Sequence, residues 1–222
     1  MPAASTWTLP TSTSVPHEFA STNLQLAVRI ADQLDLQLAD IESGREQALS
    51  LELDAKSPLE SYVRENDLVF TSEEAPDAPV RTQVYIRGLA DEAACELILS
   101  RQTSLLDCAA PMSLRLPANQ PLRLSNDRLV SAQSSDLGGD DLALLLQADA
   151  QTACCLLFYP GDADQIEVSA SHLIVRCFTA PLEKGVIRRV RARLFFASLD
   201  GIESTLTAQY AKFRQSELPL TT

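Results

Sequence analysis

Three arginines occupy every second position of one short segment near the C-terminal end of the chain. They are Arg189, Arg191 and Arg193, within residues 186–196. In a β-strand, successive side chains point to opposite faces, so the three arginines share one face and the apolar residues between them share the other. Same-face neighbours in a strand lie roughly 6.6 Å apart. Guanidinium groups in such a row suit a carboxylate, a phosphate or an acidic loop, because their planar forks bind these groups through paired hydrogen bonds.

Two other segments carry residues that extend this candidate site. Residues 166–178 alternate so that His172 and Arg176 share a face, and both join the arginine row if this segment pairs with residues 186–197. Residues 80–87 alternate in the same way and place Tyr85 and Arg87 on one face. The following residues form the predicted ligand-binding set: Arg189, Arg191, Arg193, Arg176, His172, Tyr85 and Arg87.

A second interpretation of the same arginines requires no ligand. The chain has 30 acidic residues, enough to supply each arginine with a carboxylate on a neighbouring strand. Such cross-strand ion pairs are worth about 0.2–1 kcal/mol and usually carry no function when exposed. His172 by itself is more typical of a hydrogen-bonded or surface residue than of a catalyst. Anion binding and simple ion pairing therefore both stay open at this point.

The overall charge restricts the partners. The chain has 18 basic and 30 acidic residues and a net charge of −12, which repels nucleic acid and anionic membranes over long range. Five of the basic residues nevertheless fall within positions 184–193. Since salt screens charges beyond about 8–10 Å, a local anion site is compatible with an acidic chain. We expect an acidic small molecule or protein as partner, and neither nucleic acid nor membrane; the oligomeric state stays open.

The N-terminal residues have neither the basic start nor the apolar core of a signal peptide, and no apolar stretch approaches the ~20 residues of a membrane helix. The five cysteines are an odd number without a C-x-x-C pair, which favours reduced thiols. We therefore expect a cytoplasmic protein.

Motifs for catalysis or cofactor binding are missing. The chain has no G-x-S-x-G segment and no glycine-rich phosphate-binding loop. It has only two histidines, His17 and His172, far apart in the sequence. The loop 136–141 offers three carboxylates that suit Ca²⁺, although a solvated turn is the simpler interpretation. We assign no catalytic residue, no metal and no cofactor.

Alternating apolar residues predict a mainly β protein. Residues 24–30 and 34–39 indicate a hairpin, although a helix also fits their spacing. The nearly continuous apolar segments 142–146 and 153–159 are typical of strands buried on both faces. Within residues 202–213, apolar side chains recur at helical intervals. The order of elements predicts an antiparallel two-sheet sandwich with one C-terminal helix at about residues 200–214.

The domain organisation follows from composition. Residues 1–18 are rich in Ser, Thr and Pro and are interpreted as a flexible arm, and residues 19–222 as a single β-sandwich domain. Aligning Val80 with Val186 preserves the inward and outward pattern of both segments, which suggests an internal duplication as a further hypothesis.

Three patches of the chain have a familiar sequence: residues 66–69 (NDLV), 182–189 (LEKGVIRR) and 217–222 (ELPLTT). Together they resemble a conserved, uncharacterised bacterial protein family without assigned function. The resemblance implies a complete protein of that kind and identifies no functional residue.

Three functions are compatible with these features. The first is a non-enzymatic binding protein that recognises an acidic ligand or partner through the arginine-rich strand face. The second is a carbohydrate-binding protein or sugar-active enzyme that uses a concave sheet with His172 and the arginines. The third is a structural or assembly protein.

Overall fold

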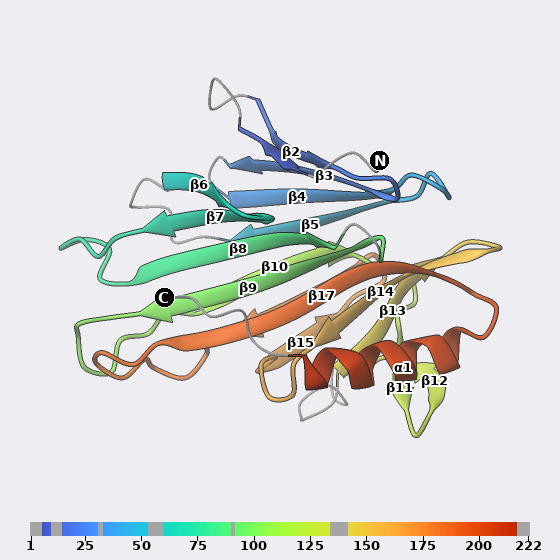
Figure 1. Cartoon of the computed structure of the whole chain (residues 1–222). Coiled ribbons are helices and arrows are strands. Elements are labelled where there is room, and N and C mark those ends of the chain that lie inside the picture. The colour runs from blue at the N-terminus through green and yellow to red at the C-terminus, as the bar shows by residue number, and fades with distance from the viewer. Residues whose placement is uncertain are drawn as a thin grey trace.

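The computed structural model describes residues 6–9, 15–30, 33–52, 60–89, 92–133 and 142–216. In these residues the chain forms two antiparallel sheets of eight and nine strands and one C-terminal helix (Figure 1). The expected sandwich with a terminal helix is thereby confirmed. The loop 136–141 and the segment 217–222 lie outside the described residues.

The first sheet has the order β1-β2-β3-β4-β5-β10-β16-β15. Its strands are β1 (Thr6–Thr8), β2 (His17–Ala20), β3 (Leu24–Ile30), β4 (Gln33–Asp40), β5 (Glu46–Glu52), β10 (Met112–Pro117), β15 (Gln165–Val168) and β16 (His172–Cys177). The second sheet has the order β12-β11-β13-β14-β17-β9-β8-β7-β6. Its strands are β6 (Glu60–Arg64), β7 (Asp67–Ser72), β8 (Arg81–Leu89), β9 (Ala94–Gln102), β11 (Leu122–Ser125), β12 (Arg128–Ser131), β13 (Leu142–Ala148), β14 (Thr152–Phe158) and β17 (Arg188–Ser198).

The N-terminal part of the chain belongs to the first sheet. Strands β3 and β4 pair antiparallel along their whole length, so the hairpin prediction is confirmed and the helical alternative is wrong. Strand β1 lies within the segment that we expected to be a flexible arm. Its Trp7 ring packs 5.3 Å from the Phe19 ring, and its indole N–H donates a hydrogen bond of 2.9 Å to the carbonyl of Asn66. Burial of this large aromatic side chain attaches β1 to the sandwich.

The inner faces of the two sheets enclose the main hydrophobic core. Inward-facing residues of β17, among them Val190 and Leu194, pack in the same cluster as Leu26 and Leu36 of the first sheet. Strands β13 and β14 are buried on both faces, as expected from their continuous apolar sequence. Cys154 belongs to the inter-sheet core, whereas its neighbour Cys155 belongs to a second cluster on the outer face.

Gly88 of β8 packs directly against Phe19 of β2 in the opposite sheet. A Cβ atom at this position would lie 2.5 Å from the Cε1 atom of the buried Phe19 ring. We expect Gly88→Ala to lower the free energy of unfolding by about 1–3 kcal/mol, the usual cost of overpacking a core. Urea unfolding measures this loss, and the same substitution in a Phe19→Leu background should cost clearly less. An equal cost in both backgrounds would contradict the clash.

One pairing expected from the sequence is wrong. Residues 166–178 form the hairpin β15–β16 in place of one strand, and β16 pairs with β10 and β15 in the first sheet. Strand β17 lies in the second sheet between β14 and β9. The long connection of residues 178–187 crosses from one sheet to the other, and sequence alternation carries no information on that choice.

The helix α1 (Ile202–Gln215) covers part of the outer face of the second sheet. Gly201 is the N-cap residue of this helix and has a φ angle of +67°, a left-handed conformation that favours glycine. Leu206, Tyr210 and Phe213 are buried against Ala143, Leu157 and other outer-face residues. In Figure 1 the helix runs alongside β17, β14 and the β11–β12 hairpin, which it also contacts. No helix among the described residues is long and apolar enough to cross a membrane.

Candidate functional site

The three arginines lie on the outer face of the second sheet, where three strands align the predicted residues in rows. Strand β9 separates β8 from β17, and the register brings residues of all three strands level. The pocket row consists of Gln83, Ser100 and Arg189, and the middle row of Tyr85, Ile98 and Arg191. The charged row consists of Arg87, Glu96 and Arg193. Tyr85, Arg87, Arg191 and Arg193 of the predicted set thus share one face of the sheet with Arg189.

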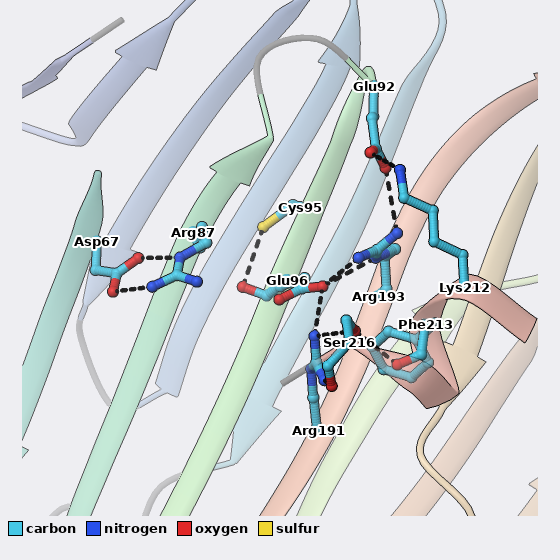
Figure 2. Close-up of polar contacts among 10 residues, drawn as sticks. All are labelled: Asp67, Arg87, Glu92, Cys95, Glu96, Arg191, Arg193, Lys212, Phe213 and Ser216. Carbon is cyan, nitrogen blue, oxygen red and sulfur yellow. Dashed lines mark hydrogen bonds and ion pairs between the residues drawn. The ribbon is translucent and has the colours of Figure 1, made fainter. Parts of the chain in front are cut away.

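Two of the arginines are buried and ion-paired with one glutamate. Arg191, Arg193 and Glu96 expose only 2%, 4% and 2% of their surface. The Oε1 atom of Glu96 accepts hydrogen bonds from Arg191 Nη2 at 3.0 Å, Arg193 Nε at 3.0 Å and Arg193 Nη2 at 2.5 Å. Figure 2 shows Glu96 extending toward both guanidinium groups. At these two positions ion pairing accounts for the arginine pattern.

The end of α1 completes the surroundings of this pair. The Phe213 ring lies 4.6 Å from the guanidinium carbon of Arg191 and 5.2 Å from that of Arg193. Arg191 donates hydrogen bonds to the carbonyl oxygen of Ser216 at 3.0 Å and to its hydroxyl at 2.8 Å. Glu92 pairs with both Arg193 and Lys212 (Figure 2). The buried arginines therefore fix the last turn of the helix to the sheet.

Arg87 has a carboxylate partner of its own. Its Nε and Nη2 atoms donate to the two carboxylate oxygens of Asp67 at 2.6 and 2.7 Å, a bidentate pair. The hydrogen bond with Asp67 raises the pKa of Arg87 above its usual value. Arg64 of β6 pairs with Asp67 of β7, which pairs with Arg87 of β8. The charged row therefore alternates in sign across β6, β7, β8, β9 and β17. Such alternation stabilises neighbouring strands in this register.

His172 and Arg176 lie on the other sheet and do not join the arginine row. The Nδ1 atom of His172 lies 2.7 Å from the hydroxyl of Ser169, in the turn between β15 and β16. Arg176 forms an exposed ion pair with Glu167 of β15 at 2.5 Å. Their expected contribution required β16 to pair with β17, and that pairing is wrong. The crossing of the chain between the sheets separates them from Arg189.

The third arginine, Arg189, lines a hollow of about 240 Å³ on the outer face of the sheet. The lining residues come from β6, β8, β9, β17 and the loop before β17: Tyr62, Arg81, Gln83, Tyr85, Ser100, Gln102, Ile187 and Arg189. Burial raises the pKa of the Tyr85 hydroxyl, so this group is a neutral hydrogen-bond donor at pH 7. Arg81 also forms a 3.2 Å ion pair with Glu73, and both of these side chains are exposed. We call this hollow the arginine–tyrosine pocket.

The pocket combines two cations with several uncharged polar groups. Arg81 and Arg189 come from strands on either side of β9 and are offset by two residues along it, so their backbones are about 12 Å apart. Their long side chains can approach one bound anion from two directions, and the amides of Gln83 and Gln102 and the Ser100 hydroxyl line the same hollow. This arrangement can bind a carboxylate or phosphate group and orient it.

A partly buried carboxylate, that of Asp162, lies against the backbone of β17 at Arg191. Asp162 accepts a 2.6 Å hydrogen bond from the backbone N–H of Arg191, and burial raises its pKa to about 6. The pKa of this carboxyl is near 4 in the unfolded chain and about 6 in the folded protein. The folded protein therefore loses stability as the pH rises from about 4 to about 6, because ionised Asp162 is disfavoured by burial. We therefore expect Asp162→Asn to raise the free energy of unfolding at pH 7 by about 1–2 kcal/mol, allowing for partial exposure, and to change it little at pH 4.

Urea unfolding at the two pH values measures this difference. Asp77→Asn provides the matched control, because it removes the same charge from an exposed turn residue. A pH dependence in Asp162→Asn equal to that of the unmodified protein would contradict the role of Asp162.

Several residues of the site escaped the sequence analysis. Glu96, Asp67, Tyr62 and Arg81 lie in alternating segments with no motif of their own. Arg81, Gln83 and Tyr85 share one parity in the sequence, which is a usable signal. The contribution of Tyr62 depends on the placement of β6 at the sheet edge and has no local signature.

Comparisons with known proteins identify the fold. No protein-family model matches the chain, and no curated protein matches it. Two solved structures of the alpha-N-acetylgalactosaminidase of Bifidobacterium bifidum share its architecture. The complex with GalNAc has 12% sequence identity and a TM-score of 0.58, and covers 89% of this chain and 39% of that chain. The complex with Gal-NHAc-DNJ has 14% identity and a TM-score of 0.55, with the same coverage. The chain thus spans about two fifths of the glycosidase, and the likeness concerns the fold.

Proposed function

We propose that this protein is a non-enzymatic binding protein that recognises an acidic ligand in the arginine–tyrosine pocket. The supporting observation is the convergence of Arg81 and Arg189 with Tyr85 on one small hollow of a chain whose net charge is −12. Arginine forks bind carboxylate and phosphate groups strongly, and the partly enclosed position reduces screening by solvent. We place the binding site at the Arg189 end of the row because Arg189 lines the hollow, whereas Arg191 and Arg193 are buried under α1.

Titration of the ¹⁵N-labelled protein with N-acetylglutamate, inorganic phosphate and uncharged N-acetylglutamine tests this function. We expect the acidic probes to shift backbone signals of β8, β9 and the start of β17, and N-acetylglutamine to shift none. Arg189→Gln and Arg81→Gln should each weaken acid binding about tenfold or more, since a hydrogen bond to a charged group is worth about 1.5–3 kcal/mol.

Arg29→Gln is the matched control, because Arg29 is an exposed arginine of β3 in the other sheet. It should leave the affinity unchanged, and circular dichroism checks that all variants are folded. Equal affinity for N-acetylglutamate and N-acetylglutamine, or an equal loss in Arg29→Gln, would disprove acid recognition at this pocket.

A carbohydrate is the second candidate ligand of the same pocket. The favouring observation is the pair Tyr62 and Tyr85 together with two amide side chains, groups that pack against sugar rings and bind hydroxyls. The glycosidase with the same fold was solved with GalNAc. Adding GalNAc to the titration separates the two candidates: binding of GalNAc unaffected by Arg189→Gln would favour the sugar.

A further inference from the structure

An exposed apolar surface lies next to the arginine–tyrosine pocket. Leu105, Leu106, Val186 and Ile187 expose between 42% and 77% of their surface and come from two loops at one end of the second sheet. One loop follows β9 and the other precedes β17, and the two lie side by side (Figure 1). The Gly185 N–H of the second loop donates a hydrogen bond of 2.8 Å to the Thr103 carbonyl of the first. Clustered exposed apolar side chains of this size are typical of interaction sites. We call these four residues the apolar rim.

The two loops are held in place by hydrogen bonds. The Thr103 hydroxyl donates to the Pro79 carbonyl at 2.7 Å and accepts from the Leu105 N–H at 3.1 Å. Cys108 and Leu182 exchange two backbone hydrogen bonds. Below the loops, Val80, Ala110 and Leu182 form a small buried cluster. The interior is therefore filled without the rim residues, and the rim presents a preformed surface.

The rim is continuous with the pocket. Ile187 belongs to both, because it lines the pocket and is half exposed. A volume of about 240 Å³ is smaller than the ~300–1,000 Å³ typical of small-molecule sites, but it is sufficient for one acidic side chain. The loop before β17 also exposes one charge of each sign, Glu183 and Lys184, so the positive charge of the combined surface comes from Arg81 and Arg189 of the pocket. Together the two parts match a partner with a carboxylate next to large apolar side chains.

We propose that the apolar rim and the arginine–tyrosine pocket together dock a segment of a partner protein in which Asp or Glu stands beside large apolar residues. The acidic side chain enters the pocket between Arg81 and Arg189, and the apolar side chains cover Leu106 and its neighbours. The inference rests on the proposed function, since it names the molecule that carries the acidic group. Arginine and tyrosine, which the pocket supplies, are among the residue types that carry most of the affinity in protein interfaces.

Short capped peptides test this inference by NMR titration of the ¹⁵N-labelled full chain. The probes are acetyl-Gly-Glu-Leu-Leu-Gly-amide and acetyl-Gly-Leu-Leu-Glu-Gly-amide, with N-acetylglutamate for comparison. We expect at least one peptide to bind tenfold or more tightly than N-acetylglutamate and to shift signals of both loops. Replacing Glu by Gln, or both Leu by Ser, in the peptide should each weaken binding about tenfold.

Variants of the protein separate the two parts of the surface. Leu106→Ser should reduce peptide affinity to that of N-acetylglutamate and leave the affinity for N-acetylglutamate unchanged. Val130→Ser is the matched control, because Val130 is an exposed apolar residue of β12 at the opposite edge of the sheet. It should change neither affinity.

The possible results decide between the claims. If N-acetylglutamate binds and neither peptide binds more tightly, the partner inference is wrong and the proposed function stands. If neither acid nor peptide binds, both are wrong. The inference is also overturned if Leu106→Ser abolishes binding to phosphatidylcholine or phosphatidylglycerol vesicles, or dissociates a dimer seen by sedimentation velocity, while no peptide binds. The rim would then face a membrane or a second copy of the chain.

Discussion

Replacement of Glu96 by glutamine is expected to lower the free energy of unfolding by about 3–5 kcal/mol, the cost of breaking a buried ion pair. The Oε1 atom of Glu96 accepts hydrogen bonds from Arg191 and Arg193, and all three residues are buried. Glutamine keeps the size of the side chain but removes the charge. Arg193 would then keep its ion pair with Glu92, which is partly exposed and also pairs with Lys212, and Arg191 would keep its hydrogen bonds to Ser216.

Urea unfolding followed by circular dichroism measures this loss. Glu167→Gln is the matched control, because it removes the same charge from the exposed pair with Arg176 and should cost at most about 1 kcal/mol. Replacing Glu96, Arg191 and Arg193 together by Leu, Met and Met should recover much of the stability, since apolar residues often replace buried charges without loss. A loss below 1 kcal/mol in Glu96→Gln would show that the cluster is not essential for stability.

Truncation of Phe213 to alanine is expected to cost about 3–5 kcal/mol, the usual range for a buried phenylalanine. The ring is fully buried between α1 and the sheet and contacts Tyr159 at a centroid distance of 6.4 Å. It also covers the guanidinium groups of Arg191 and Arg193. Its loss would expose this buried pair to water and weaken the attachment of α1.

Hydrogen exchange locates the effect and urea unfolding gives its size. Amides of α1 should exchange faster in Phe213→Ala, whereas those of β3 and β4 in the other sheet should change less. Phe213→Leu keeps most of the apolar area but loses the cation–π contacts, so it should cost only about 1–2 kcal/mol. Ser204→Ala, at an exposed position of the same helix, should have almost no effect. Unchanged protection of α1 in Phe213→Ala would contradict this role.

Most of the strands were predictable because their apolar residues alternate. Leu26 and Leu36 belong to segments of strict period two, and Cys154 and Cys155 to a segment that is apolar on both faces, so local sequence indicated both strand and burial. The error at residues 166–178 has a different origin. Alternation continued through Ser169 and Ser171, and it concealed the turn that separates β15 from β16.

The candidate site was predictable only in part. The shared face of Arg189, Arg191 and Arg193 followed from parity, and Tyr85 and Arg87 lie level with two of these arginines across β9. Which arginine lines a pocket was not predictable. Arg191 and Arg193 have the same local pattern as Arg189, yet α1 covers them and Glu96 neutralises them.

The sequence by itself determined the strands, their inward and outward faces, the terminal helix and the common face of the arginine row, because these properties depend on the period of neighbouring side chains. The tertiary structure decided which strands pair, and therefore separated His172 and Arg176 from the row and placed Arg81 and Tyr62 beside Arg189. Pairing between strands distant in the chain depends on how the two sheets enclose their core and on the path of the connections. No local period records that choice.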